Sequence, residues 1–133
     1  MSTMYRSVTH DIAVSVLPEY LPERSDVDRG HWFWAYTIEI ANEGETAVQV
    51  THRHWRITDA NGHMEEVRGP GIVGEQPLLK PGETFRYTSG CPLGTSSGFM
   101  VGSYRILEEG GKVFEVDIPM FSLDPPAEKR VLN

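Results

Sequence analysis

Alternation of apolar and polar side chains with a period of two recurs along this chain, and it limits the folds open to it. The clearest segment covers residues 32–40, where Trp32, Trp34, Tyr36, Ile38 and Ile40 share one parity. Successive side chains of a β-strand point to opposite faces, so this segment predicts a strand with one buried face. No window of a dozen residues keeps a helical apolar stripe free of Gly and Pro. The pattern therefore predicts an all-β protein.

Six further segments of similar character bring the prediction to about seven strands: 8–16, 47–59, 63–68, 84–89, 99–107 and 113–118. Turn residues separate them, among them Asn61-Gly62, the usual pair of a type I′ hairpin. Within 47–59 the apolar parity changes between Val50 and Trp55, which predicts a β-bulge near Arg53. Short strands with turns between them are typical of an antiparallel β-sandwich of the immunoglobulin or fibronectin type III kind. We expect one domain over residues 1–125 and a frayed tail over 126–133.

Charge and cysteine content exclude several classes of function. The net charge is −7, from 12 Lys and Arg against 19 Asp and Glu, which argues against nucleic-acid binding and against a polybasic hold on membranes. Apolar runs are far shorter than the roughly 20 residues of a membrane span, and residues 1–5 do not resemble a signal peptide. Cys91 is the single cysteine, so an intrachain disulfide and a Cys-based zinc site are excluded. These features predict a cytoplasmic protein.

The sharpest local motif is Gly69-Pro70-Gly71-Ile72-Val73-Gly74, which matches G-x-G-x-x-G. In dinucleotide-binding folds such glycines let backbone amides approach a pyrophosphate at a helix N-terminus. Here prolines follow where that helix should begin. Two interpretations stay open: a structural loop, or an anion cradle formed by Gly69, Gly71 and Gly74 with the cations Arg68 and Lys80. Several nearby glutamates would repel a bare phosphate, so the second interpretation suits a nucleotide accompanied by Mg²⁺ or Co²⁺.

Metal and catalytic chemistry find less support. His52 and His54 lie two apart and would share a strand face as candidate metal ligands, but the predicted bulge interrupts that face and surface histidines are more common than ligands. We therefore expect no metal site and no cofactor. Cys91 precedes Pro92 in a segment expected to be a loop, which suits an exposed but inert thiol, and no G-x-S-x-G elbow surrounds the serines. The chain is predicted to be no enzyme, with a phosphohydrolase as the remote alternative.

Several motifs, in order, resemble those of one bacterial family. The run R-G-P-G-I-V-G-E-Q-P-L-L-K-P-G-E-T-F-R-Y-T-S-G, beginning at Arg68, closely resembles the signature of the ApaG family, also called DUF525. Segments 33–38, 53–59, 98–104 and 114–123 are similar as well, so the resemblance extends over about residues 8–125. It implies a fibronectin type III-like sandwich, an association of bacterial members with cobalt resistance and magnesium efflux, and a role as an interaction module in eukaryotic proteins. It also implies a pyrophosphate-binding role for the glycine loop.

The leading prediction is a non-enzymatic binding module with a protein partner. Its expected contact surface is the apolar part of the loop after Arg68, formed by Ile72, Val73, Leu78 and Leu79. Without a membrane span the chain cannot itself move an ion, so a link to Co²⁺ or Mg²⁺ would be indirect. The alternative is a nucleotide or pyrophosphate binder using residues 69–74. An exposed edge strand also allows a homodimer. The sequence identifies neither the ligand nor the partner.

Overall fold

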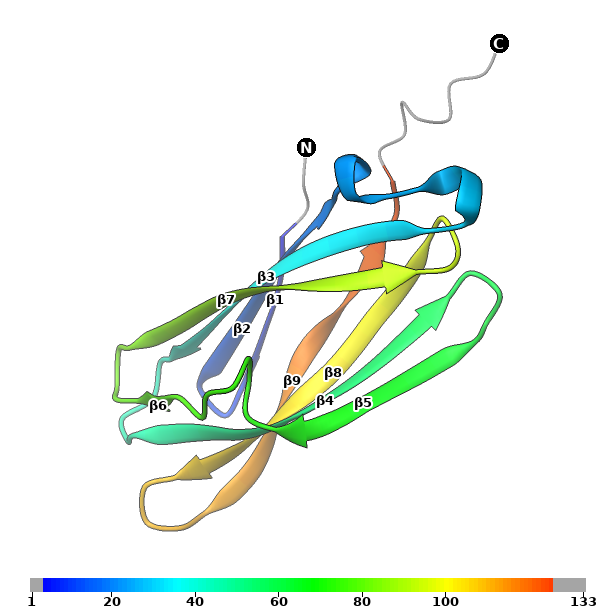
Figure 1. Ribbon diagram of the computed structural model, residues 1–133. Coiled ribbons are helices and arrows are strands. Elements are labelled where there is room, and N and C mark those ends of the chain that lie inside the picture. Colours follow the sequence, from blue (N-terminus) through cyan, green and yellow to red (C-terminus); the bar gives the residue numbers. More distant parts are fainter. Residues whose placement is uncertain (1–3, 126–133) are drawn as a thin grey trace.

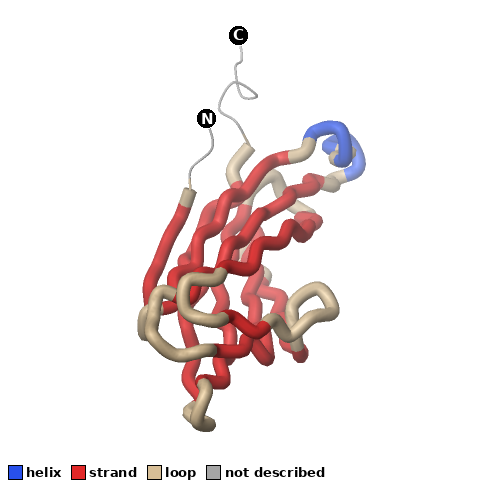
Figure 2. Tube along the Cα trace, turned by 90° about the vertical axis from the view of Figure 1, so that its left-hand side faces the viewer, coloured by secondary structure: helices blue, strands red, loops and turns tan. Residues whose placement is uncertain are grey.

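The computed structural model describes residues 4–125, so the predicted tail at 126–133 lies outside the described residues. Figures 1 and 2 show a β-sandwich with two short 3-10 turns, η1 (Pro22–Arg24) and η2 (Val27–Arg29), at one end. The nine strands are β1 (Tyr5–Thr9), β2 (Ile12–Tyr20), β3 (Trp32–Asn42), β4 (Val48–Asp59), β5 (Met64–Pro70), β6 (Leu78–Leu79), β7 (Thr84–Leu93), β8 (Gly98–Glu108) and β9 (Val113–Leu123).

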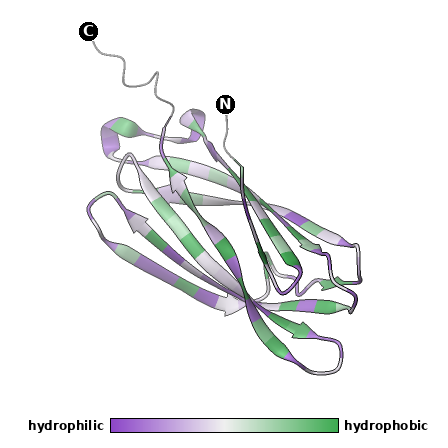
Figure 3. Ribbon diagram, turned by 180° about the vertical axis from the view of Figure 1, so that it is seen from behind, coloured by the Kyte–Doolittle hydropathy of each residue, from purple (hydrophilic) through white to green (hydrophobic). Residues whose placement is uncertain are grey.

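Two antiparallel sheets form the sandwich, as the sequence predicts. One has the strand order β1-β2-β3-β7, and the other has the order β5-β4-β8-β9 with β6 paired to β4. Apolar residues recur along the strands of both sheets (Figure 3), and those on the facing sides fill the core. Among the fully buried side chains are Val14, Val16, Ile38, Ile40, Val50, Tyr104, Ile106, Val116 and Leu123. No helix within residues 4–125 is long and apolar enough to cross a membrane.

The single strand predicted over 8–16 is wrong. The chain instead reverses at His10 and Asp11, whose φ values of 49° and 64° are both left-handed, and β1 pairs back onto β2 with Thr9 opposite Ile12. A two-residue hairpin turn of type I′ requires positive φ at both of its central residues. Since neither residue is glycine, the turn carried no clear signal, and the apolar alternation continued through it. Val8, which would share the buried face of Val14 and Val16 in a single strand, is 48% exposed.

The predicted bulge in β4 is present but lies two residues earlier. The register of β4 against β8 shifts between Val50 and His52, which leaves Thr51 as the extra residue. Because of this shift, Val50 before the bulge and Trp55 after it are both buried. The bulge also turns the side chain of Arg53 toward the space between the sheets.

The two sides of the sandwich differ. Along one side β1 lies against β9, where the Ser7 hydroxyl donates to the Asp117 carbonyl at 3.0 Å and the Asp117 amide donates to the Thr9 hydroxyl at 3.2 Å. Along the other side the edge strands are β5 and β7, which belong to different sheets and do not pair. The sandwich is therefore closed along β1 and β9 and open along β5 and β7.

Candidate functional site

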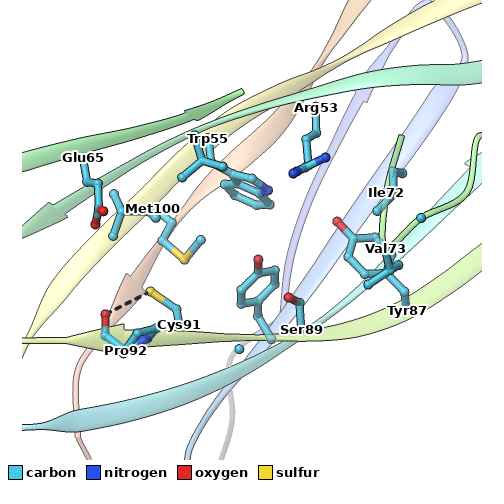
Figure 4. Close-up of a pocket in the computed structure, with 15 residues that line it drawn as sticks. Arg53, Trp55, Glu65, Ile72, Val73, Tyr87, Ser89, Cys91, Pro92 and Met100 are labelled. Atoms are coloured by element: carbon cyan, nitrogen blue, oxygen red, sulfur yellow. Dashed lines mark hydrogen bonds between the residues drawn. The ribbon is translucent and has the colours of Figure 1, made fainter. Parts of the chain in front are cut away.

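A cleft of about 450 Å³ lies between the two sheets on the open side of the sandwich. Figure 4 shows its lining: side chains from β4 and β5 face side chains from β7 across the gap. Trp55, Val67 and Met100 supply apolar surface, whereas Arg53 and Glu65 supply opposite charges. We call this space the inter-sheet cleft.

Strand periodicity explains which side chains reach the inter-sheet cleft. After the bulge, Arg53, Trp55 and Ile57 share the inward parity of β4. On β7 the same alternation directs Tyr87, Ser89 and Cys91 inward. The sequence predicts this strand but places its end at Ser89, whereas β7 continues to Leu93.

Arg53 connects the inter-sheet cleft to the glycine loop. Its Nη1 donates to the carbonyl oxygens of Pro70 and Gly71 at 3.0 and 3.1 Å. A Cβ atom at Gly69 would lie 3.2 Å from both terminal nitrogens of this guanidinium, so the glycine makes room for it. Within residues 4–125 no carboxylate lies within 4.0 Å of Arg53. Sequence reasoning missed this residue, although the parity change at the bulge was the available signal.

Phenol groups mark the inner end of the cleft. The hydroxyl groups of Tyr87 on β7 and Tyr104 on β8 are hydrogen bonded to each other and so join the two sheets. Burial raises the pKa of both phenols, and also that of Tyr36 on β3. All three are therefore neutral donors and acceptors at ordinary pH.

Cys91 is buried, contrary to the exposed position that its expected loop suggests. It is 3% exposed on β7, and its Sγ lies 3.8 Å from the Pro92 carbonyl oxygen. Burial raises the pKa of the Cys91 thiol to about 11, with a smaller contribution from the negative charge of Glu65. Since the thiolate is the nucleophilic form, Cys91 is a poor nucleophile at neutral pH.

The glycine motif forms a tight hairpin. Ile72 and Glu75 exchange backbone hydrogen bonds of 2.7 and 2.9 Å, and the residues between them, Val73 and Gly74, have φ values of 44° and 82°. The Gly71 amide donates to the Thr51 carbonyl at 2.7 Å. The amides of Gly71, Ile72 and Glu75 are thus engaged within the chain, and no helix follows them. This differs from a dinucleotide-binding turn, whose amides point at the ligand.

The residues proposed to accompany this motif do not converge. Arg68 lies on the outer face of β5, where its Nη2 contacts the Glu66 carboxylate at 3.1 Å, and Lys80 is exposed beside the short strand β6. Of the predicted contact surface, Ile72 and Leu79 are 1% and 3% exposed and belong to the core, whereas Val73 and Leu78 are each 60% exposed. A buried side chain is not available to a partner, so that surface reduces to two residues.

His52 and His54 share the outer face of β4, because the bulge lies before both of them. They do not point at a common ligand position: the His54 Nε2 contacts the Glu66 carboxylate at 2.7 Å, and the His52 Nδ1 lies 3.0 Å from the Thr51 hydroxyl. The pKa of Glu66 is lowered, first by the hydrogen bond to His54 and then by that to Arg68. No group of three or more His, Cys, Asp or Glu side chains in the described part of the chain is arranged to hold a metal ion.

Comparison with known proteins identifies the family. The family model for the ApaG domain matches residues 22–108. Two relatives named Protein ApaG, from Beijerinckia indica and Methylocella silvestris, are 65% and 62% identical over 130 residues, covering 98% of this chain and their full lengths. The chain belongs to the ApaG family. The resemblance found in the sequence is thereby confirmed.

A solved structure supports the architecture of this ApaG domain. The crystal structure of the putative ApaA protein from Bordetella pertussis matches with a TM-score of 0.86 and 51% sequence identity, covering 90% of this chain and 98% of that one. The fold of this chain is therefore shared by a solved protein.

Proposed function

We propose that this ApaG domain is a non-enzymatic binding module and that a segment of a partner protein enters the inter-sheet cleft. The observation that carries the proposal is the one-sided closure of the sandwich, which leaves a cleft of about 450 Å³ on the β5–β7 side. Binding residues are commonly presented by a rigid scaffold at such openings. This places the contact region between the sheets instead of at the loop tip that the sequence suggested.

The chemistry of the cleft favours an extended peptide segment. Ile57 and Val67, which are only half-buried, offer an apolar surface for a side chain, and the edge strand β7 beside the opening has free backbone groups that an extended segment can use. Arg53 has no carboxylate partner in the described part of the chain, so it is available to an acidic group of the ligand.

Two further features support binding over catalysis or nucleotide recognition. Cys91, which lines the cleft, has a pKa of about 11 and is a neutral thiol at physiological pH. The glycine loop uses the amides of Gly71, Ile72 and Glu75 for its own hairpin, which weighs against a pyrophosphate cradle at 69–74.

The link to cobalt resistance and magnesium efflux, which the family resemblance implies, would then pass through the partner. We place the module in the cytoplasm, where its single cysteine stays reduced. In this scheme the domain recognises a protein that handles the ion and needs no metal site of its own.

The test fills the cleft with a bulky side chain. Peptides that bind the wild-type protein are first selected from a random phage-displayed library. Their affinity is then measured for wild type and for Ser89→Phe, which directs a ring into the cleft from β7. We expect affinity to fall about tenfold or more. Arg86→Phe, on the outer face of the same strand, serves as the matched control and should change affinity less than about twofold.

The binding site is mapped by amide NMR with the tightest selected peptide. Shifts should gather on β4, β5 and β7 around Trp55 and Ser89. Selected peptides that bind the wild type and Ser89→Phe equally would contradict the cleft. If the library yields no binder, a binding module for extended segments is excluded.

A further inference from the structure

The edge strand β5 has backbone amides and carbonyls that bond to no other strand. The surrounding hydrogen bonds determine which residues of β5 carry these free groups. The Gly71 amide donates to Thr51, and the Asp59 amide donates to the His63 carbonyl at 2.9 Å. Both pairs continue the register of β4 against β5, in which hydrogen-bonded pairs recur every second residue. The odd-numbered residues of β5 therefore bond to β4, whereas the amides and carbonyls of Met64, Glu66 and Arg68 point away from the sheet.

The other edge strands, β1, β7 and β9, are either covered or interrupted by a proline. β1 and β9 cover each other, and hydroxyl groups of Ser7 and Thr9 satisfy backbone groups of Asp117. The edge of β7 carries Pro92, which has no amide hydrogen to donate. By contrast, β5 has no bulge in its pairing with β4 and no proline before its last residue, Pro70. Such a free edge is suited to pairing with another strand.

The charges on β5 select one way of pairing two copies. In an antiparallel pair centred on Glu66, two carboxylates would lie opposite each other, and a pair centred on Arg68 would oppose two guanidinium groups. A pair centred on Val67 places Glu66 of each copy opposite Arg68 of the other. Opposite charges directly across an antiparallel pair stabilise it, and like charges destabilise it.

We propose that two copies of this chain form a symmetric dimer by pairing their β5 strands antiparallel, with the two-fold axis at Val67. The outward amides and carbonyls of Glu66 and Arg68 then bond across the axis, and Pro70 ends the ladder on both sides. On the inner face Val67 meets its own copy, and Glu65 faces Gly69 of the second copy, which avoids a clash of charge. The two five-stranded sheets become one continuous sheet.

This dimer would join the mouths of two inter-sheet clefts, since Glu65 and Val67 line each of them. The inference does not depend on what the cleft binds, because it rests on the edge of β5 alone. Pairing seven-residue strands buries less surface than a typical obligate interface, so we expect a reversible, concentration-dependent dimer.

Sedimentation equilibrium of the full chain from about 5 to about 500 µM tests the proposal. Wild type should shift from monomer to dimer over this range. Glu66→Arg opposes arginine to arginine, and Arg68→Glu opposes glutamate to glutamate. Each should weaken the dimer about tenfold or more, whereas the double variant Glu66→Arg/Arg68→Glu should recover most of the lost affinity.

Arg86→Glu, a charge reversal on the outer face of β7, is the matched control and should leave the dimer unchanged. Urea unfolding of each variant confirms that the monomer stays folded. A wild type that stays monomeric across the range would overturn the proposal. So would a double variant as weak as its two single parents, since a contact elsewhere in the molecule would not restore the charge pairing.

Discussion

At the scale of one residue, Gly71 belongs to a motif that resembles a ligand-binding loop, but its role here is to allow the backbone to turn. Its φ of 70° lies in the left-handed region, and a Cβ atom there would come within 2.6 Å of the Glu75 carbonyl oxygen. Neither restriction concerns a ligand. The glycine allows the chain to leave β5, bond to Thr51 and reverse within a few residues.

Gly71→Ala is therefore expected to lower the free energy of unfolding by about 2–4 kcal/mol, from left-handed strain and the contact with Glu75. Gly94→Ala is the control, because its φ is not left-handed and no atom outside its chain neighbours lies within 4 Å of its Cβ position. It should change stability by less than about 0.5 kcal/mol. Urea denaturation measures both, and equal effects would contradict this role for Gly71.

The sequence predicted single residues well where parity alone decides their direction. Trp34 and Tyr36 are buried as expected, and the parity change in β4 revealed the bulge. The sequence could not show that Arg53 and Arg68 differ in direction. Arg68 precedes Gly69 in the chain, and Arg53 faces Gly69 from the neighbouring strand. Their difference comes from the pairing of β4 with β5, which turns Arg53 inward and Arg68 outward.

At the scale of elements, most strands follow from the alternation, and the exceptions have physical causes. The β1–β2 hairpin was missed because His10 and Asp11 adopt left-handed conformations without glycine. β2 also runs on past Pro18, which is tolerated because β1 pairs only as far as Val16 and none of the strands described within residues 4–125 lies beside the proline on that side. Such facts depend on which strands become neighbours, and one sequence does not contain them.

The amides of β5 alternate between those bonded to β4 and those facing solvent, and this alternation predicts a pattern of amide hydrogen exchange. At a few micromolar, where the protein is monomeric, the amides of Val67 and Gly69 should exchange slowly because they bond to β4. Those of Glu66 and Arg68 should exchange at least about tenfold faster because they face solvent. At high concentration the Glu66 and Arg68 amides should gain protection. Slow exchange of both sets in the monomer would show that the assigned phase is wrong.

At the scale of the whole molecule, the two sheets are held together by a core that contains ionisable groups in their neutral form. Burial raises the pKa values of Tyr36, Tyr87 and Tyr104 above the ordinary 10.0, and that of Cys91 from 9.0 to about 11. Each group loses its proton in the unfolded chain at a lower pH than in the folded protein. The stability linked to these groups is thus fully present below their ordinary pKa values and is lost as pH rises past them.

We therefore expect the free energy of unfolding to fall as pH rises above about 9, with a slope of up to about 1.4 kcal/mol per pH unit for each group involved. Cys91 acts first, because its ordinary pKa is the lowest of the four. Urea titrations at several pH values measure the slope. Cys91→Ala should flatten it between about pH 9 and 10 relative to wild type. A stability that stays constant up to about pH 10.5 would contradict the neutral core.

The contacts between β1 and β9 also make the sandwich mechanically one-sided. Ser7 and Thr9 form hydrogen bonds with the backbone of Asp117 along one long side, and no strand pairing joins the sheets along the opposite side. Inside the sandwich the Tyr87–Tyr104 hydrogen bond also joins the sheets, so a small rotation of one sheet against the other would have to keep or break that bond as well. If the sheets rotated about the β1–β9 seam, Asp117 would be displaced least and Glu65 and Ser89 most, so the cleft would change width while the strand pairings stayed the same.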